Sequence, residues 1–153
     1  MRTKDSMNAP EALVLTMVLV AVADEGITDR EIGIMAGQVQ TLPAFHEFTT
    51  AQLNDVTEAA VGLLNEENGL AHAAHLIRDA LSPKLRETAY ALACEVIAGG
   101  SQGIGRMTGQ RANRGQALDM LDFVREELGL DSLIAGAIER GVRARYQRIE
   151  PAG

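Results

Sequence analysis

The sequence predicts an all-α protein, a single-domain bundle of six to seven helices. Three observations predict this class: 46% of the 153 residues are hydrophobic but only 3% are aromatic, apolar residues recur at helical spacing, and Pro, Gly and Asn mark clear boundaries. A core of Ala, Leu, Val, Ile and Met suits close-packed helices better than sheets. The length is that of one domain with a sizeable core.

Charge and cysteine content exclude several classes of protein. The chain carries 21 acidic and 14 basic residues, for a net charge of −7, and has a single Cys. Nucleic-acid affinity comes largely from neutralising phosphates, so we expect no nucleic-acid partner. One Cys makes neither an intrachain disulfide nor a Cys-rich zinc module.

The first expected helix is opened by Asn8 and Pro10, because Pro is tolerated at the first helical position. It includes the apolar run 13–23, which is too short to span a membrane, since a spanning helix needs about 20 residues. No small-residue cleavage site follows the run. A helix that is apolar on all sides is typical of the centre of a bundle. We therefore expect a cytoplasmic protein without membrane insertion.

The second and third helices have local start and stop signals. A capping box ending at Glu31 starts the second, which stops before Pro43. The third begins near Thr50, and the Asn-Gly pair at 68–69 breaks it. The side chains expected to face inward are Ile32, Met35, Val39, Leu42, Leu53, Val56, Ala60, Leu63 and Leu64.

Four further helices complete the expected bundle. The fourth spans 70–81, and the fifth spans 84–98 after a Ser-Pro cap. The sixth ends at Gly129, whose conformational freedom suits a C-cap, and Asp131 caps the seventh. In these last two helices the side chains expected to face inward are Leu118, Leu121, Val124, Leu128, Leu133, Ile134, Ala137, Ile138 and Val142.

Residues 99–116 interrupt this pattern with six glycines, three arginines and no acid. Because Gly disfavours helix, we expect a mobile Gly/Arg-rich loop insertion. Its first part is similar to the phosphate-binding turn of short-chain dehydrogenases. That turn requires a preceding strand, whereas here a helical segment precedes it, so we expect no nucleotide site. A local shift of reading frame is an alternative origin of this segment.

The chain divides into two similar halves. The Ala- and Val-rich segments 14–24 and 89–99 are each followed by an amphipathic helix, which predicts two pseudo-repeated helical hairpins packed around two central helices. The helices at 13–23 and 86–98 are therefore expected to be the most buried. The expected organisation is an N-terminal tail at 1–10, a helical domain at 11–148 that contains the insertion, and a C-terminal tail at 149–153.

A buried helix ending at Asp24, a Gly-bearing turn with Ile-Thr-x-x-Glu, and the later run 85–98 together resemble the TerB-like (tellurite resistance protein B) family. The resemblance covers the chain from about residue 11 to 146 apart from the insertion. It implies an all-α two-hairpin fold, cytoplasmic residence, a role in tellurite and stress resistance, and acidic loop residues that bind a metal. It implies no catalytic reaction. The family's second acidic turn is replaced here by the glycine segment.

The acidic turn is the candidate metal site, formed by Asp24, Glu25, Asp29 and Glu31. Hard divalent cations bind several carboxylate oxygens, and a turn lets these converge. The alternative is that Asp29 and Glu31 complement the helix N-terminus, with Thr28 and Glu31 as the capping box. This alternative leaves only Asp24 without a role, and the candidate cofactor is a divalent metal ion.

Other residues with chemical potential have simpler interpretations. His72 and His75 lie three apart on a helix and are expected at the surface, since Ala surrounds both and no Glu or Asp occurs in that helix before Asp79. Cys94 lies on an apolar helix, where a lone Cys behaves as a small hydrophobe. The arginines of 140–148 do not form one clean face and are expected in solvent.

The sequence therefore predicts a non-enzymatic, TerB-like binding or adaptor module of tellurite or chemical-stress resistance, with protein partners from a stress-response system. The alternative is a purely structural helical interaction domain, a homodimer or partner-binding, without ligand. Metal dependence discriminates between the two, because an ion that binds only the folded state stabilises it.

Overall fold

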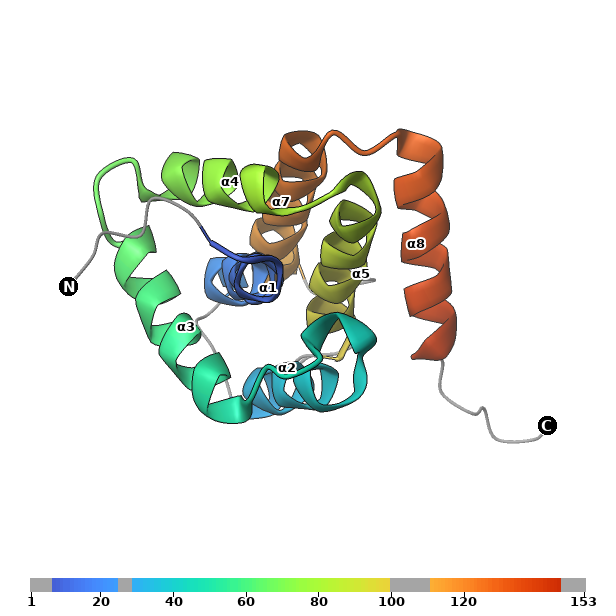
Figure 1. Ribbon diagram of the computed structural model, residues 1–153. Coiled ribbons are helices and arrows are strands. Elements are labelled where there is room, and N and C mark those ends of the chain that lie inside the picture. The colour runs from blue at the N-terminus through green and yellow to red at the C-terminus, as the bar shows by residue number, and fades with distance from the viewer. Residues whose placement is uncertain (1–6, 25–28, 100–110, 147–153) are drawn as a thin grey trace.

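The computed structural model of the chain is an all-α bundle, as the sequence predicts (Figure 1). It describes residues 7–24, 29–99 and 111–146. Within these ranges the helices are α1 (Ala9–Asp24), α2 (Asp29–Thr41), the 3-10 helix η1 (Pro43–Phe45), α3 (Thr50–Leu64), α4 (Gly69–Ala80), α5 (Pro83–Gly99), α7 (Arg111–Leu128) and α8 (Ser132–Arg145), and there is no strand. None of the described helices combines the length and apolarity that a membrane crossing requires.

Short polar motifs start several helices. At α1 the backbone N–H of Glu11 donates to the Asn8 side chain at 2.9 Å, and the Glu11 carboxylate accepts from the Asn8 N–H at 3.0 Å. Thr49 and Gln52 form the same reciprocal capping box at α3. At α8 the predicted cap is confirmed, since the Asp131 carboxylate accepts a backbone N–H of the first turn at 2.9 Å. These bonds satisfy N–H groups that the helix itself leaves unpaired.

Helices α1 and α5 form the centre of the core and pack against each other (Figure 1). Every residue of α1 from Ala12 to Ala21 is buried, and so is nearly all of α5 from Ala89 onward. The hydroxyl of Thr16, within this run of α1, donates to the Ala12 carbonyl at 2.8 Å, so the buried polar group is satisfied. The prediction that these two helices are the most buried is confirmed.

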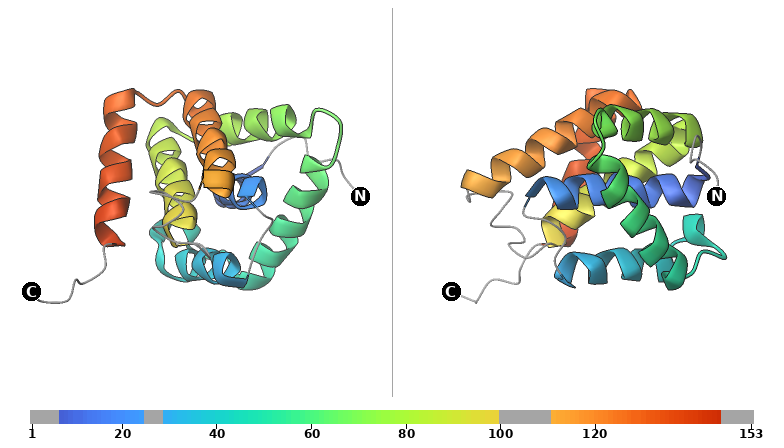
Figure 2. Two further views of the ribbon diagram at one scale, coloured as in Figure 1. Left: turned by 180° about the vertical axis from the view of Figure 1, so that it is seen from behind. Right: turned by 90° about the vertical axis from the view of Figure 1, so that its left-hand side faces the viewer.

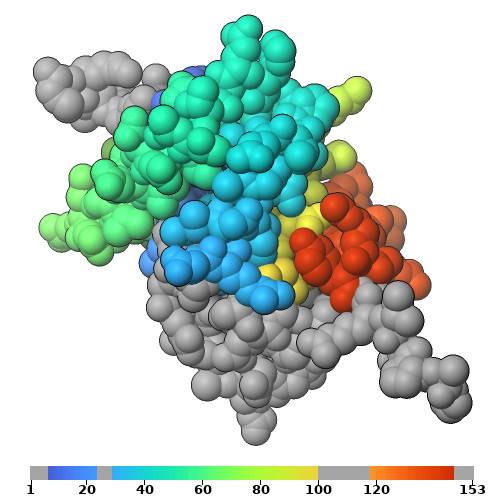
Figure 3. Space-filling model, turned by 90° about the horizontal axis from the view of Figure 1, so that it is seen from below, coloured from blue at the N-terminus to red at the C-terminus, as the bar shows by residue number. Residues whose placement is uncertain are grey.

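The remaining helices pack across the two halves of the chain, and α2 makes fewer contacts with α1 than with α5. Helix α3 packs on α1 and α8 packs on α5, while α2 lies mainly against α5 and α7 mainly against α1 (Figure 2). Helix α4 joins the halves and contacts α1, α3 and α7. In the view of Figure 3, the end of α5 lies between α2 and α8. Each central helix is therefore covered by helices from both halves.

Several predicted inward positions are wrong. The following face solvent to a substantial degree: Ile32, Leu133, Ile134 and Ala137. In α2 the buried residue of the first turn is Glu31, and in α8 the buried residues are Ala135 and Val142. The apolar spacing of a short helix defines a stripe but not the partner it meets. Because α5 is the described helix on which α8 mainly packs, the α5 surface selects the inward face of α8.

Most of the predicted loop at 99–116 cannot be compared with the structure, because residues 100–110 lie outside the described residues. Gly99 is the last residue of α5, and α7 already begins at Arg111, so the loop assignment of 111–116 is wrong. Ala, Arg and Gln favour helix there and outweigh one Gly. Gly99 is packed so closely that a Cβ would lie 2.8 Å from Ile34 Cδ1 and 3.0 Å from Tyr146 Cε2.

Candidate functional site

The structure separates the described members of the predicted acidic turn. Asp24 ends α1, but its side chain and Glu25 lie outside the described residues. Asp29 is exposed at the start of α2, whereas Glu31 is fully buried two residues later, so the two point to different sides of the helix. Within the described part of the chain no group of three or more His, Cys, Asp or Glu side chains could hold a metal. The metal site stays a prediction.

A polar contact joins α2 to α5 next to this turn. The Arg30 side chain donates from Nε to the Gly99 carbonyl at 2.9 Å. A carbonyl in the last turn of a helix lacks an intrahelical partner, so Arg30 satisfies it. Tyr146, which follows α8, lies against the same glycine. The ends of three helices therefore meet at Gly99.

Helix α8 is held on α5 by a cluster of hydrogen bonds that we call the α5–α8 polar contact. Its members are Tyr90, Glu95, Glu139, Arg145 and Tyr146. The Glu95 carboxylate is only 3% exposed, pairs with the Arg145 guanidinium and accepts the Tyr146 hydroxyl at 2.7 Å. The Tyr90 hydroxyl donates to the Glu139 carboxylate. Each buried polar group is thus satisfied, and the contact is structural.

Burial changes the titration of the groups in and beside this contact. It raises the pKa of Tyr146 to about 12, and the hydrogen bond to Glu95 acts in the same direction. It also raises the pKa of Tyr90, again with a contribution from the hydrogen bond to Glu139. Cys94 is buried as predicted, and burial raises its pKa to about 12. Because the thiolate is the nucleophile, Cys94 is not poised for covalent chemistry.

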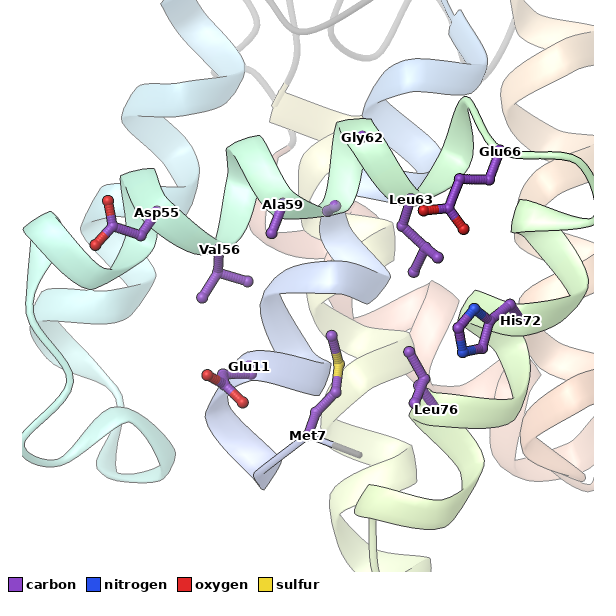
Figure 4. Close-up of a pocket in the computed structure, with 11 residues that line it drawn as sticks. Met7, Glu11, Asp55, Val56, Ala59, Gly62, Leu63, Glu66, His72 and Leu76 are labelled. Atoms are coloured by element: carbon purple, nitrogen blue, oxygen red, sulfur yellow. The ribbon is translucent and has the colours of Figure 1, made fainter. Parts of the chain in front are cut away.

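A different site lies on the other side of the bundle, between α1, α3 and α4 (Figure 4). This half-open cavity, the α3–α4 pocket, has a volume of about 510 Å³. Small-molecule sites typically have volumes of about 300–1,000 Å³ and mostly apolar walls. The residues that line it are Met7, Glu11, Asp55, Val56, Ala59, Ala60, Gly62, Leu63, Glu66, His72 and Leu76.

The pocket exists because α3 and α4 meet at a tight corner and diverge from it (Figure 1). Asn68 takes the left-handed conformation there, with φ at 62°, and Gly69 follows as the first residue of α4. A Cβ on Gly69 would lie 2.1 Å from the carbonyl oxygen of Leu63. Only Gly permits this approach of the two helix ends. The Asn-Gly pair predicted to break the helix therefore also shapes the cavity.

The polar side chains of the pocket occupy its two ends. Glu66 and His72 lie at one end, and Glu11 and Asp55 lie toward the other (Figure 4). Of the described residues that line the pocket, three are acidic and none is Lys or Arg. Glu11 takes part in the α1 capping box. The side chains of Asp55, Glu66 and His72 make no hydrogen bond or ion pair with another described residue.

Sequence reasoning missed this set of residues. It grouped His72 with His75, but His75 is exposed and its Nε2 lies 3.0 Å from the Asp79 carboxylate. His72 is half-buried and lines the pocket. A partial signal exists, because the α3 members of the pocket recur at helical spacing and so share one face of the helix. The contributions of α1 and α4 have no local signal.

Comparison with known proteins finds no match for this chain among family models, curated proteins or solved structures. The TerB-like resemblance therefore stays a prediction. The class that the fold and the site define is an all-α bundle with an open, mostly apolar pocket beside its central helix α1.

Proposed function

We propose that this chain is a non-enzymatic binding module and that the α3–α4 pocket receives its ligand. The observation that carries the proposal is the cavity of about 510 Å³ between three helices, with apolar walls and a few polar groups at its ends. Apolar walls supply affinity through the hydrophobic effect, and a small number of polar groups orient the ligand. This combination favours binding of a small molecule over a purely structural role.

The TerB-like resemblance of residues 24–31 and 85–98 supports a wider setting for this binding. On that basis we propose a role in cytoplasmic tellurite or chemical-stress resistance. The acidic turn is then a second binding region, distinct from the pocket. Calorimetric titration with calcium, magnesium and zinc tests it separately, because an ion held by the folded state releases or absorbs heat and raises the melting temperature.

The test of the pocket uses phenylbutanol, a neutral probe with an apolar body. We expect saturable binding, seen as a rise in melting temperature and as ligand-observed NMR signals. Ala59 lines the pocket from α3 and is exposed, so Ala59→Phe fills the cavity without disturbing the core. Ala51 is exposed on the same helix but does not line the pocket, so Ala51→Phe is the matched control.

The expected result is loss of probe binding in Ala59→Phe and full binding in Ala51→Phe. Circular dichroism of both variants checks that the helices are intact. Equal binding in the two variants would place the probe elsewhere on the surface. The proposed function would be rejected if the unmodified chain showed no saturable binding of phenylbutanol, phenylbutylamine or phenylbutyrate.

A further inference from the structure

We infer that the ligand of the α3–α4 pocket is a small organic cation, an amine with an apolar body, whose ammonium group binds beside Glu66 and His72. This inference rests on the proposed function of the pocket and adds the chemical class of its ligand. Two properties of the site carry it: the apolar surface between its ends, and the sign of the charges that surround it.

The apolar body is indicated by the middle of the pocket. Met7, Val56, Leu63 and Leu76 lie between the two polar ends (Figure 4). They come from α3, α4 and the segment that precedes α1 and converge on one space, so a ligand there loses contact with water on several sides. Burial of apolar surface is favourable in proportion to its area, which selects a ligand with an alkyl or aryl portion.

The charge of the ligand is indicated by the acidic residues. Glu11, Asp55 and Glu66 all border the cavity, and no Lys or Arg is among the described residues that line it. An anion placed there meets negative potential from both ends, whereas a cation is attracted. The described lining of the pocket therefore favours an ammonium group over a phosphate or a carboxylate.

The position of the ammonium group is indicated by Glu66 and His72. An ammonium has three N–H donors, and a carboxylate and an imidazole nitrogen both accept hydrogen bonds. The acidic groups of the α5–α8 polar contact are already engaged by Arg145 and two tyrosines. Glu66 and His72 have no such side-chain partner among the described residues, so both can bind a ligand.

The size of the cavity identifies the occupant as a free small molecule. A volume of about 510 Å³ matches the range of small-molecule pockets. A protein partner would require a contact area far larger than this opening, on the order of 800 Å² on each side. We therefore assign the site to a soluble amine and not to a docked helix.

The test compares three probes of nearly equal size: phenylbutylamine, phenylbutanol and phenylbutyrate. We expect the amine to bind about five-fold more tightly than the alcohol, and the carboxylate more weakly than the alcohol, because partly exposed charges contribute modestly. The advantage of the amine should shrink when salt rises from about 0.1 M to about 1 M, since salt screens exposed charges. Dissociation constants from NMR titration measure both effects.

Two matched variants test whether the Glu66 carboxylate causes the preference for the amine. Glu66→Gln should reduce the affinity for the amine to that for the alcohol and leave alcohol binding unchanged. Glu58 is exposed on the same helix and does not line the pocket, so Glu58→Gln should preserve the preference. Equal affinity for amine and alcohol, or an unchanged ratio in Glu66→Gln, would overturn the inference. The proposed function would survive either result if Ala59→Phe still abolished alcohol binding.

Discussion

Helices α3 and α8 occupy corresponding places in the two halves of the bundle, but they meet their central helices in different ways. Helix α8 is joined to α5 by buried hydrogen bonds and an ion pair, centred on Glu95. Helix α3 meets α1 through apolar contacts and, together with α4, leaves the α3–α4 pocket open. The α5–α8 polar contact therefore makes α5 and α8 the closed side of the bundle. Helices α1, α3 and α4, which border the α3–α4 pocket, are its open side.

The difference follows from the two central helices. The buried run of α1 is aliphatic apart from Thr16, which bonds to its own helix and needs no partner from another. Helix α5 carries Tyr90 and Glu95 at buried positions. A buried carboxylate or hydroxyl is costly unless it is hydrogen-bonded, so α5 requires donors and acceptors that α8 supplies. The aliphatic surface of α1 has no buried polar side chain that needs a hydrogen-bond partner from α3.

The largest expected effect tests the corner that shapes the open side. Gly69→Ala should lower the free energy of unfolding by about 3 kcal/mol, because the new Cβ would meet the Leu63 carbonyl and the backbone must move. Gly141→Ala on α8 is the control, since a Cβ there meets nothing within 4 Å and should stabilise by up to about 1 kcal/mol. Urea unfolding of both variants measures the difference. Wild-type stability in Gly69→Ala would disprove the tight corner.

The second effect tests the closed side. Arg145→Ala should lower the free energy of unfolding by about 1–2 kcal/mol, because it leaves the buried Glu95 carboxylate without its cation. This is less than for a fully buried pair, since the Arg145 side chain is 67% exposed to solvent. Arg140→Ala, at an exposed position of the same helix, should change stability by less than about 0.5 kcal/mol. A double-mutant cycle with Glu95→Gln should show coupling, and strict additivity would refute the contact.

The third effect is a loss of stability at alkaline pH that comes from the closed side. Folding raises the pKa of Tyr146 from an ordinary value of about 10 to about 12. The folded state therefore holds this proton more tightly, and the resulting stability is complete below about pH 10 and lost as the pH rises toward about 12. The raised pKa values of Tyr90 and Cys94 act in the same direction.

Tyr146→Phe isolates this contribution. The variant should be less stable at neutral pH, because Glu95 loses a donor, but its stability should fall less steeply between about pH 10 and about pH 12. Urea midpoints recorded across this range measure the slope. An identical slope in the variant and the unmodified chain would mean that Tyr146 ionises as freely when folded as when unfolded.

The smallest effect concerns which face of α8 meets α5. Leu133→Ala should change the free energy of unfolding by less than about 0.5 kcal/mol, because this residue is 82% exposed. Val142→Ala should cost about 1–2 kcal/mol, because this residue is buried and the change leaves a cavity. The reverse ranking in thermal or urea unfolding would show that α8 packs on α5 through Leu133 and not through Val142.

The sequence by itself determined where most helices begin and end. Asn8, Gly129 and Asp131 act through hydrogen bonds or dihedral angles within a few residues, so a local pattern is sufficient to place them. It also determined that α1 and α5 are central, because a helix that is largely apolar must be covered on several sides. These features depend on the chain's own neighbours and on its overall polarity.

The tertiary structure alone decided which surfaces face each other. Glu31 is buried while Ile32 is exposed, contrary to the pattern of apolar spacing, because the inward face of α2 depends on the helices against which it packs. The α3–α4 pocket is bordered by Glu11 of α1, Glu66 of the turn between α3 and α4, and His72 of α4, and no local rule relates Glu11 to residues so far along the chain. A cavity is a property of the space between elements, and that space exists only after packing has set their distances and angles.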